Sequence, residues 1–455
     1  MERFYAITTR RAVVDGAVKP AAIVIDAEKG LITDVKQPEN VPKDLEVEDV
    51  GDDVVMPGMI DVHVHVNEPG RTHWEGFETA TKAACAGGIT TIVDMPLNST
   101  PVTTTAEAFR EKLHATSEKL FVDCGFYGGL VPGNVEHLPE LLDAGVLGIK
   151  AFLCHSGIDE FPNATEAELR AVMPLLTKRD IPLLVHAELV DDEAPAIADP
   201  RSYEQYAASR PERWEHRAIE GLIDLCRQTG CAVHIVHLAA SKALPALREA
   251  RAEGLPITVE TCPHYLYFAT EEIPDGDPRY KCAPPIRDAE NRRKLRASLK
   301  SGGIDLVATD HSPSPPELKN LGIGDIEGAW GGIASLQLMV PALWTSTREQ
   351  DATVADIARW TSTRPARLLG LDNEIGTISP GKKAHLVVWD PEASFTVDAG
   401  KLHHRHPVSP YDGAEFYGTV RATYLSGRKV FDGQTVSSTP TGNPILRTTM
   451  TGDTP

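Results

Sequence analysis

The chain has 455 residues, of which 42% are hydrophobic and 24% are charged. These proportions are typical of a globular protein with a sizeable core, and they argue against a largely disordered chain. The formal net charge of -20, from 65 acidic and 45 basic residues, would repel phosphate backbones and anionic lipid headgroups. We therefore expect neither a nucleic acid nor a membrane as partner.

The N-terminal stretch MERFYAITTRR lacks the apolar segment of a signal peptide. It also contains no apolar run long enough to span a bilayer. This favours a cytoplasmic protein. The seven cysteines are scattered, odd in number and form no C-x-x-C pair, which disfavours a disulfide framework and a thiolate zinc site. We expect them to be small buried residues in a reducing compartment.

Short β-rich runs separated by turns occupy both ends of the chain. They include AAIVIDAEKGLITDVKQ near the N-terminus, and GTISPGKKAHLVVWD and YGTVRATYLSGRKVFDG near the C-terminus. The pattern predicts one small β-sandwich domain built from residues 1–55 and 376–436. Residues 437–455 are rich in Thr, Pro and Gly and are predicted to be a flexible tail.

Between the two ends, residues 56–375 alternate β-branched runs with segments of helical periodicity, such as EAELRAVMPLLTKRD. Strands that alternate with helices form parallel sheets, and eight runs predict closure into a (β/α)₈ barrel. An open doubly wound sheet is the alternative, but no G-x-G-x-x-G motif follows the first run. The eight runs end at His65, Met95, Phe126, Phe152, Glu188, Leu238, His264 and His311.

Polar residues that can bind metal ions fall at the C-terminal ends of these runs, where barrel active sites lie. His63 and His65 are two residues apart on a predicted strand, so both imidazoles point to the same side. Imidazole nitrogens and carboxylate oxygens suit zinc and similar divalent ions. Any one of these histidines could be a buried, hydrogen-bonded core residue, but the whole set favours a metal site. Its members are His63, His65, Lys150, His186, His237 and Asp310.

Lys150 is the unusual member, because an ammonium group has no lone pair to donate. A buried lysine can lose its proton, and the neutral amine can add carbon dioxide to give a carbamate with two anionic oxygens. Such a carbamate could bridge two metal ions. A salt-bridged lysine, or one that reaches the surface, is the alternative for this residue alone.

Six stretches together resemble the cyclic amidohydrolases, which include dihydroorotases, dihydropyrimidinases or hydantoinases, and allantoinases. The similarity runs from about residue 3 to residue 435, and the stretches are PGMIDVHVHVNEPG, GGITTIVDMPLN, GIKAFL, LLVHAE, VHLAAS and DLVATDH. Within this group, VNEPGRTHWEGFETAT, DMPLNSTPVTTT, FLCHSGIDEFP and KCAPPIRD are most similar to allantoinases.

The resemblance implies a homotetramer with two divalent metal ions per subunit, expected to be zinc. The ions would be bound by the six residues named above, with Lys150 as a carbamate. A hydroxide bridging the metals would attack the ring carbonyl, while Asp310 acts first as general base and then as general acid. The preferred reaction is the hydrolysis of allantoin, a cyclic ureide, to allantoate in purine breakdown. A hydantoinase or dihydropyrimidinase activity is the alternative. A non-enzymatic scaffold is disfavoured because no metal-ligand position departs from the family pattern.

Several loop residues are candidates for contact with the substrate ring. Asn67 stands where dihydroorotases have an arginine, and its amide can hydrogen bond a ureido group but cannot clamp a carboxylate. A turn-stabilising role is an equally good explanation for Asn67. Asn98, Ser156, Gly157 and the backbone around Cys282 follow barrel strands or line the expected mouth.

Three further histidines lie outside the predicted barrel strands. His385 replaces the aspartate usual in the family, in a segment expected in the small domain and away from the chemistry. His404 and His406, in KLHHRHPVSPYDG, could suggest a second metal site, but an exposed polar loop is the preferred interpretation.

Overall fold

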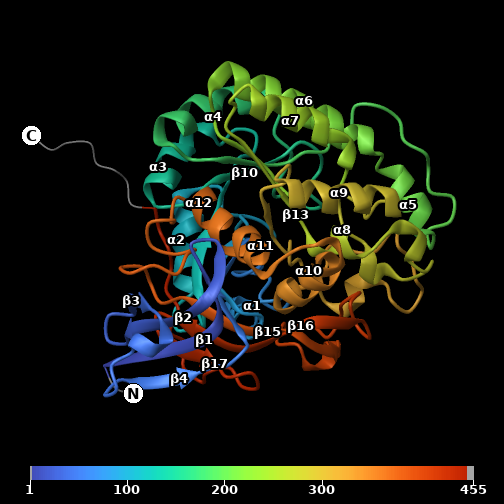
Figure 1. Ribbon diagram of the computed structural model, residues 1–455. Coiled ribbons are helices and arrows are strands. Elements are labelled where there is room, and N and C mark those ends of the chain that lie inside the picture. Colours follow the sequence, from blue (N-terminus) through green and yellow to red (C-terminus); the bar gives the residue numbers. More distant parts are fainter. Residues whose placement is uncertain (1–2, 448–455) are drawn as a thin grey trace, which may run out of the picture.

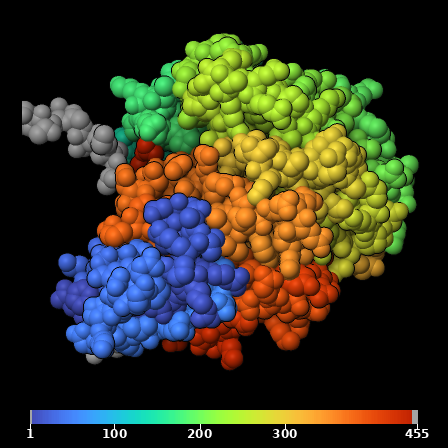
Figure 2. All heavy atoms as spheres, viewed as in Figure 1, coloured from blue at the N-terminus to red at the C-terminus, as the bar shows by residue number. Residues whose placement is uncertain are grey.

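The computed structural model describes residues 3–447 as a mixed α/β protein. Parallel strands with helices packed around them make up the larger part, and a mainly antiparallel sheet makes up the smaller part (Figure 1). Figure 2 shows the N-terminal and C-terminal portions adjoining at one end of the molecule. Within residues 3–447, no helix combines the length and apolar character that crossing a membrane requires.

The antiparallel sheet joins the two ends of the chain. Its strand order is β17-β16-β15-β5-β1-β2-β3, and β4 pairs with β1. The two ends meet where β5 runs antiparallel to β15, with Val55 opposite Val388. Alternate residues of these strands are buried against a separate apolar cluster, as the two-residue period of a strand requires. The strands are β1 (Phe4–Val14), β2 (Ala17–Asp26), β3 (Leu31–Lys36), β4 (Glu46–Asp49), β5 (Val54–Pro57), β15 (Leu386–Thr396), β16 (Glu415–Leu425) and β17 (Arg428–Phe431).

Each of the eight β-branched runs contains a parallel strand. The strands form a six-stranded sheet, ordered β14-β13-β12-β11-β10-β9, and a three-stranded sheet, ordered β6-β7-β8. The additional strand β9 is only two residues long. The strands are β6 (Met59–Val64), β7 (Ile89–Asp94), β8 (Asp123–Phe126), β9 (Gly128–Gly129), β10 (Ile149–Phe152), β11 (Leu183–His186), β12 (Val233–Ile235), β13 (Ile257–Thr261) and β14 (Leu306–Val307).

The continuous closed ladder expected of a barrel is not formed. Between β6 and the segment after β14, the two sheets share one isolated bridge, between Val64 and His311. Nearby, the Asp61 carboxylate accepts the backbone N–H of Thr309 at 3.2 Å, so a side chain takes the place of a ladder bond. At the other seam, the N–H of Leu147, just before β10, donates to the carbonyl of Phe126 in β8 at 2.8 Å. The structure therefore supports a mixed α/β fold with two adjoining parallel sheets.

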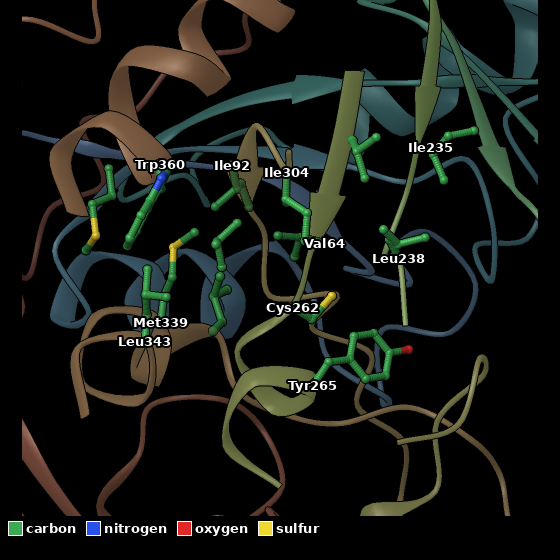
Figure 3. Packing of buried hydrophobic residues seen from close by; sticks show 14 of the residues in the cluster. Val64, Ile92, Ile235, Leu238, Cys262, Tyr265, Ile304, Met339, Leu343 and Trp360 are labelled. Carbon is green, nitrogen blue, oxygen red and sulfur yellow. The ribbon is translucent and has the colours of Figure 1, made fainter. Parts of the chain in front are cut away.

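Helices follow most of the parallel strands and bury apolar faces against them. The longest, α6, buries Ile219, Leu222 and Ile223 and ends at Gly230, whose φ of 70° suits glycine. Figure 3 shows part of the main core, including Val64 of β6 and Met339 and Leu343 of α10. The helices are α1 (Phe77–Ala86), α2 (Ala106–Ala115), α3 (Leu138–Asp143), α4 (Glu166–Arg179), α5 (Tyr203–Ser209), α6 (Glu212–Thr229), α7 (Leu244–Ala252), α8 (Pro263–Tyr267), α9 (Ala289–Ser301), α10 (Met339–Thr347), α11 (Val354–Ala358) and α12 (Arg364–Leu368).

The segment from Gly442 to Arg447 runs alongside the start of β8. The Cys124 N–H donates to the carbonyl of Asn443 at 3.0 Å, and the Ile445 N–H donates to the carbonyl of Cys124 at 2.8 Å. This part of the predicted flexible tail therefore lies in regular hydrogen-bonded contact with the parallel strands. The remainder of the predicted tail, residues 448–455, lies outside the described residues.

Candidate metal centre

The six residues singled out as metal ligands lie at the C-terminal ends of five parallel strands. Five of them line a cavity of about 590 Å³, and Lys150 is buried beside them. The strands bring them together because parallel strands end at a common edge of the sheet. Their positions are His63 in β6, His65 just after it, Lys150 in β10, His186 at the end of β11, His237 just beyond β12 and Asp310 just beyond β14.

His63, His65 and Asp310 form a buried group with the geometry of a metal site. The Asp310 Oδ1 atom is 3.3 Å from His63 Nε2 and 3.4 Å from His65 Nε2. One ligand-type atom from each residue lies within 4.8 Å of the other two. Although burial alone would raise it, the pKa of Asp310 is lowered to about 2 by the two histidines. A carboxylate and two imidazoles pointing at one another form a donor set that suits a divalent cation.

His186 and His237 form a second group beside the first. Their ring centroids are 4.6 Å apart, and the ring of His237 is 5.3 Å from that of His63. The Nδ1 atom of His237 is buried and has no hydrogen-bond partner among residues 3–447. Burial lowers the pKa of His237 well below its ordinary value, so the ring is neutral and has a lone pair available.

Lys150 lies near both groups and forms no salt bridge with any residue from 3 to 447. Its side chain is fully buried, and its Nζ atom has no hydrogen-bond partner within the described part of the chain. Burial lowers its pKa to about 8, even though Glu260 and Asp310 act in the opposite direction. Neither the salt-bridged nor the surface-reaching alternative fits this environment. A buried amine that readily loses its proton is chemically suited to carbamate formation.

Two buried carboxylates that sequence reasoning missed support the histidines. The Oε1 atom of Glu260, in β13, is 2.5 Å from His63 Nδ1. The Oε2 atom of Glu188 is 2.7 Å from His186 Nε2. Burial alone would raise the pKa of Glu260, but His63 and His234 hold it below its ordinary value. An acidic residue inside an apolar strand run, as in ITVET, is the sequence signal that could have identified Glu260.

Comparisons with known proteins point to one family. Residues 54–430 match the model of the amidohydrolase family. Allantoinase from Arabidopsis thaliana is 44% identical, covering 97% of this chain and 90% of that protein. Allantoinase from Streptomyces avermitilis is 46% identical, covering 94% of this chain and 96% of that protein.

The chain belongs to the allantoinase family of amidohydrolases. The family resemblance inferred from the sequence is therefore confirmed. Among solved structures, an L-hydantoinase (dihydropyrimidinase) from Arthrobacter aurescens superposes with a TM-score of 0.89 at 27% identity, covering 97% of this chain and 100% of that one. A mitochondrial allantoinase from Aquarana catesbeiana is 46% identical over 75% of this chain and 70% of that protein. Membership of the allantoinase family therefore does not determine the compartment.

Of the five residues expected to contact the substrate, some line the cavity and others do not. Asn98, Ser156 and Gly157 line the cavity, whereas Asn67 and Cys282 are buried beside it. The Asn67 side chain accepts a hydrogen bond from Asn98 Nδ2 at 3.2 Å and donates to the Pro313 carbonyl at 3.4 Å. These bonds and the φ of 65° at Asn67 are typical of a residue that stabilises a loop.

The carbonyl of Cys282 already accepts a hydrogen bond from the Tyr206 hydroxyl at 2.8 Å, while its neighbours Lys281 and Ala283 line the cavity. The Ser156 hydroxyl donates to the Phe161 carbonyl at 2.6 Å, which fixes the turn containing Gly157. The direct roles of all five residues toward a substrate stay predictions.

Arg210 and Lys281 also line the cavity, although they were not among the residues expected to contact the substrate. Arg210 pairs with Glu188, its Nε donating to Oε1 at 3.1 Å. Lys281 donates to the carbonyls of Glu327 and Ala329 at 2.6 and 2.7 Å. Lys319 is buried and donates to the carbonyl of Trp330 at 3.0 Å. The two lysines hold the glycine-rich loop 327–332 against the cavity.

Of His385, His404 and His406, the first two are buried. The expectation of an exposed loop is wrong for His404, which is 4% exposed with its ring centroid 5.7 Å from that of His311. The loop packs down because the Arg405 N–H donates to the buried carboxylate of Glu75. His406 is exposed. His385 is buried with Nε2 3.2 Å from Asp123 Oδ2, at the opposite end of the strands from the cavity.

Proposed function

We propose that this chain hydrolyses allantoin to allantoate, using two divalent metal ions held at the cavity floor. The observation that carries the proposal is the convergence of two histidine groups on one buried lysine that has no counterion. The names of its relatives in the allantoinase family supply the substrate.

The donor set fits a pair of divalent cations, for which zinc is our expectation. His63, His65 and Asp310 would hold one ion, His186 and His237 would hold the other, and a carbamate on Lys150 would bridge them. When bound, the ions lower the pKa of a water molecule and polarise the ring carbonyl. The buried orphan Nζ of Lys150 and the unpartnered Nδ1 of His237 support this assignment.

The residues of the chain then transfer protons and enclose the substrate. Asp310 faces both histidines of the first group through Oδ1, so it is placed to accept the proton of the attacking water. The same carboxyl group can return that proton to the ring nitrogen as the amide bond breaks. The walls of the cavity, including Phe152 and Trp330, reduce access of bulk water and strengthen these electrostatic interactions.

We also propose the finer architecture and assembly. The two adjoining parallel sheets are one (β/α)₈ barrel over residues 56–375, and residues 1–55 and 376–436 form the small β domain. Backbone contacts at both seams of the sheets support this. The active form is a homotetramer, as the resemblance to the family implies, and we propose a cytoplasmic location because the scattered cysteines suit a reducing compartment.

A hydantoinase activity is the second candidate, favoured by the structural match to an L-hydantoinase. A comparison of allantoin, hydantoin, dihydrouracil and dihydroorotate at equal enzyme and metal concentrations distinguishes the two. Allantoin should give the highest kcat/KM, because its ureido arm can pair with polar groups such as Asn98 and Ser156 that smaller rings leave unsatisfied. Dihydroorotate should be poorest. Faster opening of hydantoin or dihydrouracil than of allantoin would overturn the substrate assignment, and a metal-free wild-type protein would favour a scaffold.

A further inference from the structure

Glu260 contacts both groups of the proposed metal centre. It lies in β13 and is fully buried. Its Oε1 atom is 2.5 Å from His63 Nδ1 and accepts the backbone N–H of His237 at 3.1 Å. Its Oε2 atom is 3.0 Å from His234 Nε2. One carboxylate oxygen therefore reaches a residue of each group.

The contact with His63 fixes the tautomer of that ring. At this distance His63 Nδ1 donates its proton to the Glu260 carboxylate, and the lone pair remains on Nε2, which faces Asp310 at 3.3 Å. Carboxylates that accept from the distal nitrogen of a metal-binding histidine orient the ring and raise its basicity.

The contact with His237 acts on the backbone. The φ of His237 is 38°, in the left-handed region that a non-glycine residue adopts at an energetic cost. By accepting the N–H at this position, Glu260 stabilises the turn that directs His237 into the cavity.

Glu188 provides a natural comparison because it touches one group only. It accepts from His186 Nε2 at 2.7 Å, and its remaining contacts are with Arg210. Cys154 lies nearby, but burial raises the pKa of its thiol to about 12, so it stays protonated.

We infer that Glu260 is a positioning residue that couples the two ion-binding groups, setting the His63 ring and the His237 turn through a single oxygen atom. This inference rests on the proposed two-metal centre. Loss of Glu260 weakens binding of both ions, whereas loss of Glu188 weakens binding of one.

The test measures zinc binding to metal-free protein by calorimetry in bicarbonate buffer, for wild type, Glu260→Leu and Glu188→Leu. Glu260→Leu should weaken both binding events about 10- to 100-fold, the range typical of lost outer-shell partners. Glu188→Leu should weaken one event. Asp123→Leu is the matched control, because Asp123 is a buried carboxylate paired with His385 at the far end of the strands, and it should leave both events unchanged.

A second readout is the tautomer of His63, followed by nitrogen NMR of histidine-labelled, metal-free protein. It should be single in wild type and mixed in Glu260→Leu. If Glu260→Leu does not fold, Glu260→Gln is judged by the same criteria. Two ions bound with wild-type affinity by the folded variant, or loss of one ion only, would overturn the coupling. Wild type that binds no zinc would refute the proposed centre instead.

Discussion

Asp94 and Lys112 form a fully buried ion pair that ties α2 to the ends of β7 and β6. Lys112 Nζ donates to Asp94 Oδ2 and, at 3.3 Å, to the carbonyl of Met95. Asp94 Oδ1 accepts the N–H of Val66 at 2.9 Å, one residue beyond His65. The pair thus holds the backbone that carries the first metal-binding group.

Removing one partner of this pair should leave an uncompensated buried charge. We expect Lys112→Met to lower the free energy of unfolding by about 3–5 kcal/mol, measured by urea denaturation. The double variant Asp94→Leu/Lys112→Met should recover part of that loss, since neither charge remains. A loss below about 1 kcal/mol in the single variant would show that the charge is solvated in another way.

Lys150→Ala should bind less zinc and lose nearly all activity, because alanine has no amine on which the bridging carbamate can form. Metal content by plasma emission and turnover of allantoin are the measurements. Adding a short carboxylic acid with zinc should restore part of the activity in the variant and have no effect on wild type. A variant with two tightly bound ions and normal turnover would assign Lys150 to packing alone.

Asp310→Asn should decrease kcat by about 10²- to 10⁴-fold, the usual contribution of a positioned acid or base. Metal occupancy should fall less, because the histidines of the centre remain. Steady-state kinetics and a metal count on the same sample separate the two effects. A change confined to KM would contradict the proton-transfer role.

Lys319 should make stability depend on pH. Burial lowers its pKa to about 7 from the ordinary lysine value of 10.5, so between these values the unfolded chain binds more protons than the folded one. Stability therefore rises with pH across this window, and it is lost as pH falls toward 7. Urea midpoints at pH 7, 8 and 9 should rise less in Lys319→Met than in wild type. Equal pH slopes in the two proteins would contradict the prediction.

Two glycine substitutions should change stability in opposite directions. Gly221 lies on the exposed face of α6 with open space around it among the described residues, so Gly221→Ala should stabilise the fold by about 0.5–1 kcal/mol. At Gly442, a β-carbon would lie 2.1 Å from the carbonyl oxygen of Val122, so Gly442→Ala should separate the C-terminal segment from β8. Thermal unfolding measures the first effect, and hydrogen exchange at Cys124 and Ile445 measures the second.

Local sequence patterns predicted the strands and the residues at their ends, because strand periodicity and the common edge of a parallel sheet are short-range rules. They did not predict the seam at which Asp61 binds Thr309, since that bond joins residues 248 positions apart. The burial of His404 also depends on a distant partner, Glu75, which binds the neighbouring backbone. Glu260 was missed because an isolated acid in a strand carries no spacing signal.

The pairing of β5 with β15 has a consequence for the order of folding. β5 ends at Pro57, and its neighbour β15 begins at Leu386, so the first-made strands of this sheet acquire one of their partners only when synthesis is nearly complete. The same delay applies to β8, whose outer edge is covered by Asn443 and Ile445. Such long sequence separation slows folding and leaves strand edges exposed during synthesis. C-terminal truncation before Gly442 should therefore reduce the yield of folded protein even though it removes no residue of the cavity.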